Sequence, residues 1–415
     1  MTTGKPLPIT KRMVWNAYKQ VRGKGKAAGV DGQSLAEFEQ DRDNNLYKLW
    51  NRLASGSYFP PAVRRVEIPK SGGGKRPLGI PTVADRIAQM VVKQHLEPEL
   101  DRVFDPDSYG YRPGKSAHEA VAQARQRCWK YDWVLDLDIK GFFDAIDHDL
   151  MIRALEKHCQ DSWVLLYVKR WLSAPVMMPD GSLEERGKGT PQGGVISPLL
   201  ANLYLHYAFD MWMRQNFPGI PFERYADDSV CHCRTRQDAE QLKAELEKRL
   251  AECRLEMHPE KTQVVYCKDS SRKGEHPHIQ FTFLGFAFRP RSAMNRKGQA
   301  FTGFLPAASP ASLQRMREMI RAWRVPNLAH LPLTAIAEKL NPVLRGWVQY
   351  YGRFYPSELT KVFFYLDERL GKWLRKKSKQ YMGHKGRSQR RLKVIAKQNP
   401  GLFVHWSQRG MVAVG

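Results

Sequence analysis

A chain of 415 residues is too long for one compact core, and its length favours two or three domains. Hydrophobic residues make up 42% and charged residues 26%, an ordinary globular composition that excludes an intrinsically disordered chain. The 67 Lys and Arg residues exceed the 42 Asp and Glu residues and leave a formal net charge of +25. This charge favours a polyanionic partner, and nucleic acid is the first candidate; a merely basic protein is the alternative.

The sequence gives no sign of secretion or of membrane insertion. Residues 1–10 lack the apolar core of a signal peptide, and no stretch has the apolar length needed to span a bilayer. Six cysteines in a chain of this length do not suggest a disulfide framework. We therefore expect a reduced, cytoplasmic protein with no membrane partner.

Residues 1 to about 290 mix helical patterns with short β-rich runs, and an early basic segment spans 64–77. Its glycines allow a hairpin to bend, with Lys70 and Arg76 projecting from the two arms. The segment is not a phosphate-binding P-loop, because the first glycine of that motif is missing and no Ser or Thr follows the Lys. Its cations suit a triphosphate.

The run from Val134 to Ile139 alternates apolar and acidic residues. In a β-strand this alternation places Asp136 and Asp138 on one face and the apolar residues on the other. Carboxylates on a strand this apolar are costly unless a cation pairs with them, and a metal ion is the simplest candidate.

A second acidic site is Tyr225-Ala226-Asp227-Asp228, which lies between apolar β-type residues. The pattern predicts a hairpin with both carboxylates at its tip. An Asp pair in a turn is common by itself, but adjacent carboxylates are favoured when a divalent cation neutralises them. Together with Asp138, the pair fits two Mg²⁺ ions about 3.5–4 Å apart, the arrangement of nucleotidyl transfer.

From residue 268 to 300 the chain turns polar and glycine-rich, which predicts loop at 268–274 and 289–298. Ser309-Pro310 then predicts a helix start, and three helical runs follow, the second with a kink at Pro342. Residues 372–397 are dense in Lys and Arg, with aromatics between the charges. A solvated face is one interpretation of this segment, and contact with phosphates is the one we favour.

Several motifs, taken in order, resemble the group II intron-encoded reverse transcriptases and maturases. They span about 29 to 406 and are specific as a set. They comprise Gly29-Val-Asp-Gly, Arg76-Pro-Leu-Gly-Ile-Pro-Thr-Val-Ala-Asp-Arg, Ser108-Tyr-Gly-Tyr-Arg-Pro-Gly-Lys-Ser, the strand ending in Asp138, Gly189-Thr-Pro-Gln-Gly-Gly, Tyr225-Ala-Asp-Asp, Phe283-Leu-Gly-Phe and Leu340-Asn-Pro-Val-Leu-Arg-Gly-Trp.

The resemblance implies an α+β right-hand polymerase, with fingers and an antiparallel palm sheet, followed by an α-helical thumb or maturase domain and a basic tail. The expected boundaries are 1–125 for the N-terminal extension and fingers, 126–295 for the palm, 305–378 for the thumb and 379–415 for the tail.

The resemblance also implies the roles of individual residues. Asp138, Asp227 and Asp228 would be catalytic, and the expected ligands of two Mg²⁺ ions, with Mn²⁺ as a substitute, are these three and Ile139. The nucleotide would be bound by Lys70, Arg76, Phe143, Gln192, Gly193 and Lys261, with the Phe143 ring excluding a ribose 2′-hydroxyl. We expect nucleic acid to contact Arg112, Arg345, Lys376, Lys377, Arg387, Arg390 and Arg391.

The implied activity is RNA-directed DNA synthesis from a primer, with maturase assistance to intron splicing and retromobility. The expected partners are group II intron RNA, an RNA template with its DNA primer, dNTPs and a DNA target, with a second copy of the chain as a further candidate. The paired Cys-x-x-Cys motifs of the family's zinc endonuclease are missing, so we expect no cleavage of a DNA target and priming from nascent strands. Cys231-His232-Cys233 has the wrong spacing for zinc and is expected in the palm hairpin as reduced thiols.

Two alternatives stay open. A reverse transcriptase domesticated in phage defence or in CRISPR spacer acquisition would share the palm motifs. An RNA-binding splicing cofactor with little use of its polymerase is an alternative of another class. The bacterial cytoplasm, in association with the nucleoid or a ribonucleoprotein, is the expected location.

Overall fold

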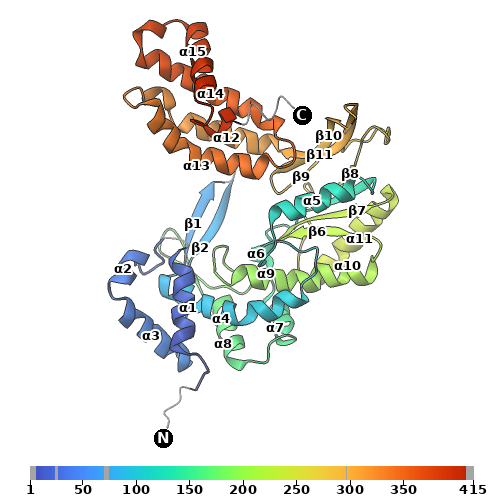
Figure 1. The fold of residues 1–415 in the computed structure, drawn as a ribbon. Helices are drawn as coiled ribbons and strands as arrows, with labels where there is room; N and C mark the ends of the chain where they lie inside the picture. Colours follow the sequence, from blue (N-terminus) through green and yellow to red (C-terminus); the bar gives the residue numbers. More distant parts are fainter. Residues whose placement is uncertain (1–5, 24–26, 70–73, 296, 408–415) are drawn as a thin grey trace. The chain divides into compact units, whose positions relative to one another are not determined.

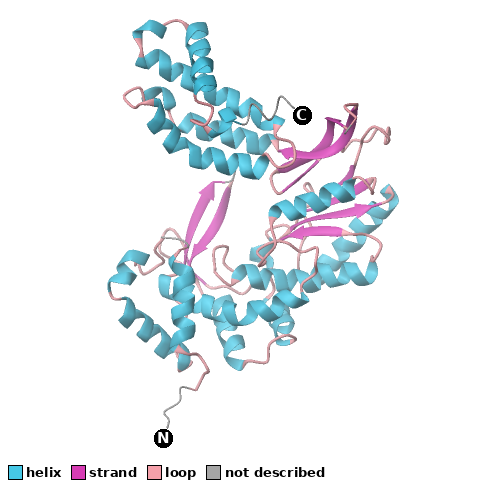
Figure 2. Cartoon of the chain, in the orientation of Figure 1, coloured by secondary structure: helices cyan, strands magenta, loops and turns pink. Residues whose placement is uncertain are grey.

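The computed structural model describes residues 6–23, 27–69, 74–295 and 297–407 (Figure 1). By its contacts the chain divides into two compact units. The first consists of Met1–Ala120 and Leu135–Gln263, and the second of Val121–Val134 and Val264–Gly415. The first unit mixes helices and strands, and the second is mainly helical (Figure 2).

Several helices of the first unit begin at side chains that cap them. The Thr10, Ser34 and Thr235 oxygens each accept a hydrogen bond from the backbone N–H three residues later, which satisfies an otherwise unpaired donor. The helices of this unit are α1 (Lys11–Arg22), α2 (Leu35–Gln40), α3 (Arg42–Ala54), α4 (Val83–Val103), α6 (Phe142–Ala145), α7 (His148–Glu156), α8 (Ser162–Leu172), α9 (Ser197–Leu205), the π-helix η1 (His206–Asp210), α10 (Met211–Asn216) and α11 (Arg236–Glu252).

Two four-stranded sheets accompany these helices. The first has the order β2-β1-β4-β5, and its antiparallel β1–β2 hairpin is the predicted basic hairpin. The second has the order β6-β7-β3-β8 and carries both acidic motifs; the boundary between the two units passes through β3 and β8. The strands are β1 (Val63–Pro69), β2 (Lys75–Ile80), β3 (Trp133–Leu137), β4 (Val176–Met177), β5 (Leu183–Glu184), β6 (Phe222–Tyr225), β7 (Asp228–Cys233) and β8 (Gln263–Tyr266).

The second unit places a three-stranded sheet before a group of helices. The sheet has the order β11-β10-β9, and Ser309 caps the first helix after it, as predicted, by accepting from the Ser312 N–H. The elements are α5 (Ala117–Cys128), β9 (Phe281–Phe283), β10 (Phe286–Met294), β11 (Ala300–Ala308), α12 (Pro310–Ala322), η2 (Val325–Asn327), α13 (Leu333–Tyr351), α14 (Ser357–Lys377), η3 (Lys379–Tyr381) and α15 (Lys385–Gln398).

The helices α12 to α15 enclose one apolar core. Leucines and other apolar side chains at helical spacing meet there, and burial of each such side chain contributes roughly 1.5–3 kcal/mol. Pro342 lies inside α13, as predicted. No helix in the described part of the chain combines the length and hydropathy that crossing a membrane requires.

The structure corrects residues 289–294 of the loop predicted at 289–298. Residues 286–294 form β10, which pairs along its whole length with β11. The prediction was wrong because a charged residue of this segment, Arg291, was expected to face solvent. In the structure Arg291 is buried and donates to the Glu358 carboxylate at 2.9 Å, so its charge is paired inside the unit. The residues predicted as a basic tail include the helix α15, which packs on α14 through Leu392.

Candidate active site

The two carboxylates of the Tyr225–Asp228 segment lie at the tip of a hairpin, as predicted. Strands β6 and β7 are antiparallel, with Tyr225 opposite Asp228, so Ala226 and Asp227 form the turn. Ala226 adopts φ +56°, a conformation that usually favours glycine. Gly110 lies against this turn so closely that an added Cβ atom would stand 2.4 Å from the Ala226 nitrogen. The turn is therefore held in one shape by its surroundings.

Asp138 directly follows β3 and is fixed by the segment that precedes β8. Its backbone carbonyl accepts from the His258 N–H at 2.8 Å, and its backbone N–H donates to the Thr262 hydroxyl. The Lys261 ammonium donates to the Asp138 carboxylate at 2.9 Å. Ile139 is buried and forms a β-bridge with Met257. A cation thus already lies on the carboxylate that was predicted to need one.

Burial and repulsion from neighbouring carboxylates raise the pKa values of Asp136, Asp227 and Asp228. Burial and the Asp227 and Asp138 charges raise the pKa of Asp228 to about 7. Burial also raises the pKa of Asp227, and burial with the Asp228 and Asp138 charges lifts that of Asp136 well above its usual value. Arg76 and Lys261 offset this effect at Asp227 and Asp228 only in part. Such crowding is relieved when a divalent cation binds.

These residues fit a hard divalent cation. Carboxylate oxygens are the ligands that Mg²⁺ prefers, and Mg²⁺ commonly uses one or two carboxylates plus substrate phosphates. In the described parts of the chain no three His, Cys, Asp or Glu side chains gather closely enough to hold a metal by themselves. The fit to a divalent cation therefore rests on the chemistry of the carboxylate oxygens of Asp138, Asp227 and Asp228.

A pH prediction follows from the raised pKa of Asp228. Between pH about 4 and 7, metal-free folded protein keeps a proton that the unfolded chain, with the ordinary pKa of 3.8, releases. The free energy of unfolding should therefore fall as pH rises through this range. Asp228→Asn removes this pH-dependent loss of stability. The melting temperature of the variant should therefore be higher than that of wild type at pH 8 in EDTA and close to that of wild type at pH 4. Calorimetry measures both; an equal difference at the two pH values would contradict the assignment.

The Gly189–Gly194 segment lies beside α6 and β2. The Thr190 N–H donates to the Phe143 carbonyl at 2.7 Å, and the Gln192 carbonyl accepts from the Gly79 N–H at 2.7 Å. Gly193 has φ +116°, and a Cβ atom there would stand 2.5 Å from the Gly79 oxygen, so only glycine fits. Phe143 is half-buried and packs edge-on against Phe142. The predicted pocket residues Phe143, Gln192 and Gly193 are thus brought together.

A buried network behind this segment is absent from the sequence predictions. Asp85 is 1% exposed and accepts from the Tyr58 hydroxyl, the Trp171 indole and the Gln89 amide. The Gln89 side-chain oxygen in turn accepts from the Val195 N–H at 2.7 Å. The signal in the sequence was an Asp and a Gln one turn apart in the first half of α4, where most neighbouring residues are apolar.

The predicted cations divide into three groups. Arg76 is exposed on β2 and lies near enough to Asp227 to offset part of the rise in the pKa of that carboxylate. Lys70 lies outside the described residues. Arg112 was predicted to contact nucleic acid, and in the structure its side chain is bound within the protein. Its side chain is 7% exposed, donates to the Asp101 carboxylate at 2.7 Å and also bonds to three backbone carbonyls. These bonds hold the loop together, and the contact of Arg112 with nucleic acid stays a prediction.

The remaining predicted cations belong to the second unit. Lys376 donates to the Asn327 side chain, and Lys377 to the Ala329 and Leu331 carbonyls, although both are exposed. Arg345 on α13 is exposed, and so are three arginines on α15: Arg387, Arg390 and Arg391.

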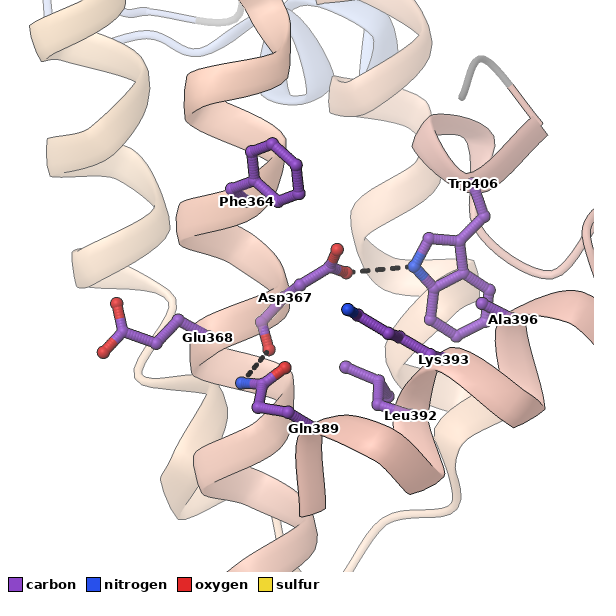
Figure 3. A pocket seen from close by; sticks show the side chains of 8 residues that line it. All are labelled: Phe364, Asp367, Glu368, Gln389, Leu392, Lys393, Ala396 and Trp406. Carbon is purple, nitrogen blue, oxygen red and sulfur yellow. Dashed lines mark hydrogen bonds between the residues drawn. The ribbon is translucent and has the colours of Figure 1, made fainter. Parts of the chain in front are cut away.

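The α15 arginines stand on a well-anchored helix. Asp367 on α14 accepts from the His405 imidazole and the Trp406 indole, each at 3.0 Å, which ties the end of the described chain to α14. Figure 3 shows the hydrogen bond between Trp406 and Asp367 beside Leu392 and Lys393 of α15, and all four residues line one pocket. The helix α15 is itself held to α14 by Leu392, which lies in the core, and by Gln389, whose amide donates to the Asp367 carbonyl.

The family model described as reverse transcriptase (RNA-dependent DNA polymerase) matches residues 68–288, more than half of the chain. The chain belongs to the reverse transcriptase family. The maturase-specific domain of group II introns matches residues 313–392 of this reverse transcriptase, which covers α12 to α14 and the start of α15. Both matches agree with the resemblance seen in the sequence.

The relatives include proteins encoded in introns. The reverse transcriptase is 31% identical over 294 residues to protein YkfC of Escherichia coli, covering 62% of this chain and 74% of YkfC. It is 37% identical over 165 residues to the group II intron-encoded protein LtrA of Lactococcus lactis, covering 40% of this chain and 27% of LtrA. It therefore spans about a quarter of LtrA.

Among solved structures, telomerase from Candida albicans, in complex with a fragment of telomeric RNA, aligns with a TM-score of 0.48 and 12% identity. The alignment covers 90% of this chain and 68% of that one. The fold assignment rests on the family match.

The Cys231 and Cys233 thiols are free and buried in β7, as predicted for the palm hairpin.

Proposed function

We propose that this reverse transcriptase extends a DNA primer on an RNA template with dNTPs at Asp138, Asp227 and Asp228. The observation that carries the proposal is the turn of β6 and β7, where two adjacent carboxylates lie in the electrostatic field of Asp138. Two Mg²⁺ ions held by these carboxylates would activate the 3′-hydroxyl of the primer as a nucleophile and neutralise charge on the leaving pyrophosphate.

The other residues of the pocket bind and orient the nucleotide. Arg76 is exposed beside the carboxylates and attracts the triphosphate. Lys261, whose ammonium lies on Asp138, is placed to move a proton from Nζ to the pyrophosphate. The Gln192–Gly193 backbone approaches the nascent base pair, and the Phe143 ring excludes a ribose 2′-hydroxyl. Lys70 keeps its predicted role as a second triphosphate contact.

We propose further that the second unit binds group II intron RNA and assists its splicing. The match to the maturase-specific domain supports this role, as do the exposed arginines of α15 and Arg345. The fold of the intron would then be stabilised by the protein, while the RNA carries out splicing. A DNA target, a homodimer and a cytoplasmic ribonucleoprotein location complete this proposal.

Two assays on the wild-type protein test the proposed function. In the first, a DNA primer on an RNA template should be extended with dNTPs and Mg²⁺, and strong chelation should abolish the product. In the second, a self-splicing group II intron RNA from the same genome should splice at a lower Mg²⁺ concentration when protein is added. Extension without any effect on splicing would favour the domesticated alternative, and splicing without extension would favour the cofactor alternative.

A further inference from the structure

The side chain of Arg224 is completely buried directly behind the catalytic turn. It lies in β6, one residue before Tyr225, and is among the largest side chains of the protein with no exposed surface. Its Nε donates to the Asp210 Oδ1 at 2.7 Å, and its Nη2 donates to the Asp210 Oδ2 at 2.6 Å. Both side chains are 0% exposed, so the pair is bidentate and fully desolvated.

The remaining nitrogen of this guanidinium faces the catalytic turn. Arg224 Nη1 donates to the Ala226 carbonyl at 3.1 Å and to the Asn202 side-chain oxygen at 3.0 Å. The Asn202 amide then donates to the Gly110 carbonyl at 2.7 Å. Gly110 is the residue that lies against the Ala226 nitrogen on the other side. One network therefore fixes the turn through its carbonyl and through its closest neighbour.

The backbone of β6 is held from the same neighbouring loop. The Arg224 N–H donates to the Asp107 carbonyl at 2.9 Å, and the Arg224 carbonyl accepts from the Tyr109 N–H at 2.8 Å. Neither the backbone nor the guanidinium of Arg224 can therefore shift without moving residues 107–110. The guanidinium is a rigid link between the π-helix η1, where Asp210 lies, and the turn.

The free energy of folding alone does not explain why this buried ion pair is present. A buried ion pair loses the hydration of both charges, and well-packed apolar side chains are often as stabilising or more so. A planar guanidinium with donors in fixed directions, however, defines geometry that apolar packing does not. One of its donors, Nη1, is aimed at the carbonyl of Ala226, the residue immediately before Asp227. π-helical turns of the kind that carries Asp210 are often found at functional sites.

We propose that Arg224 is a positioning residue that sets the affinity of the active site for divalent cations. By fixing the Ala226 carbonyl, it fixes where the Asp227 and Asp228 carboxylates stand relative to Asp138. The proposal rests on the proposed catalytic role of these three carboxylates.

The test is the Mg²⁺ dependence of primer extension by Arg224→Lys. A lysine keeps the charge, but its single ammonium cannot pair with both Asp210 oxygens and also reach the Ala226 carbonyl. We expect the Mg²⁺ concentration for half-maximal rate to rise about 10- to 100-fold, as when partners of metal ligands are removed elsewhere. The affinity for primer–template, measured in EDTA, should stay within about twofold of wild type.

A matched control separates positioning from stability. Arg291→Lys changes another buried arginine, one whose partners are Glu358 and two backbone carbonyls in the second unit. It should lower the melting temperature comparably and leave the Mg²⁺ midpoint unchanged. If Arg224→Lys does not fold, Asn202→Ala removes one acceptor of the same nitrogen and the bond to Gly110, and it should raise the midpoint by a smaller factor.

A Mg²⁺ midpoint equal to that of wild type in the folded variants, with a rate lowered only in proportion to the folded fraction, would overturn the positioning role. That result leaves the proposed function intact if Asp227→Asn/Asp228→Asn is inactive. If the doubly substituted protein still extends primers, the proposed function itself fails.

Discussion

Replacement of both Asp227 and Asp228 by asparagine is expected to lower the rate of primer extension by at least about 10³-fold, because removal of one charge-stabilising group typically costs 10²–10³-fold. Asparagine keeps the size of each side chain and removes the negative charge that would hold the cations. Single-turnover extension on an RNA template at saturating protein measures the loss.

The same substitution should not weaken RNA binding or folding. The raised pKa values of both carboxylates mean that their charges are unfavourable in the metal-free protein, so the variant should be at least as stable as wild type at pH 8. Asp149→Asn changes an exposed carboxylate in the first turn of α7 and serves as the control, with wild-type activity expected. Wild-type activity of the Asp227→Asn/Asp228→Asn protein would show that the carboxylates of the turn are not needed for primer extension.

Replacement of Arg387, Arg390 and Arg391 by alanine is expected to weaken intron RNA binding about 10- to 100-fold near physiological salt. The three side chains are exposed on α15, and each that contacts a phosphate releases a counterion. The slope of log affinity against log salt should become shallower by about 2, because each single-strand contact contributes roughly 0.7. Filter binding from low to high salt measures both quantities.

The control for this triple variant removes the same charge elsewhere. Arg236, Lys243 and Lys248 lie on α11 in the first unit, and their replacement by alanine lowers the net charge equally. If both triple variants lose the same affinity and slope, binding depends on net charge alone and α15 is not a specific surface.

The sequence was most informative where chemistry is local. Asp138 follows an alternating strand, and Asp227 and Asp228 sit between two β-type runs, so strand geometry alone placed both at strand ends. Ser309 likewise predicted the start of α12, because its hydroxyl accepts from the N–H of Ser312, only three residues later in the sequence.

Residues whose partners are distant in the sequence were harder to predict. Arg112 resembles a phosphate ligand until its Asp101 partner and three backbone acceptors are known. Arg291 made a strand look like a loop because Glu358, its partner, lies 67 residues away. The Arg224–Asp210 pair was missed for the same reason, since burial of both charges is visible only once the chain has folded.

The central claim is that DNA synthesis depends on the carboxylate turn of the first unit, while intron binding depends on the second. Its most direct test is a crossed assay in which both variants are measured for primer extension and for protein-assisted splicing. Asp227→Asn/Asp228→Asn should splice like wild type and fail to extend. The α15 triple alanine variant should extend a saturating pre-annealed primer–template and fail to assist splicing at low protein concentration. Parallel loss of both activities in either folded variant would contradict the account.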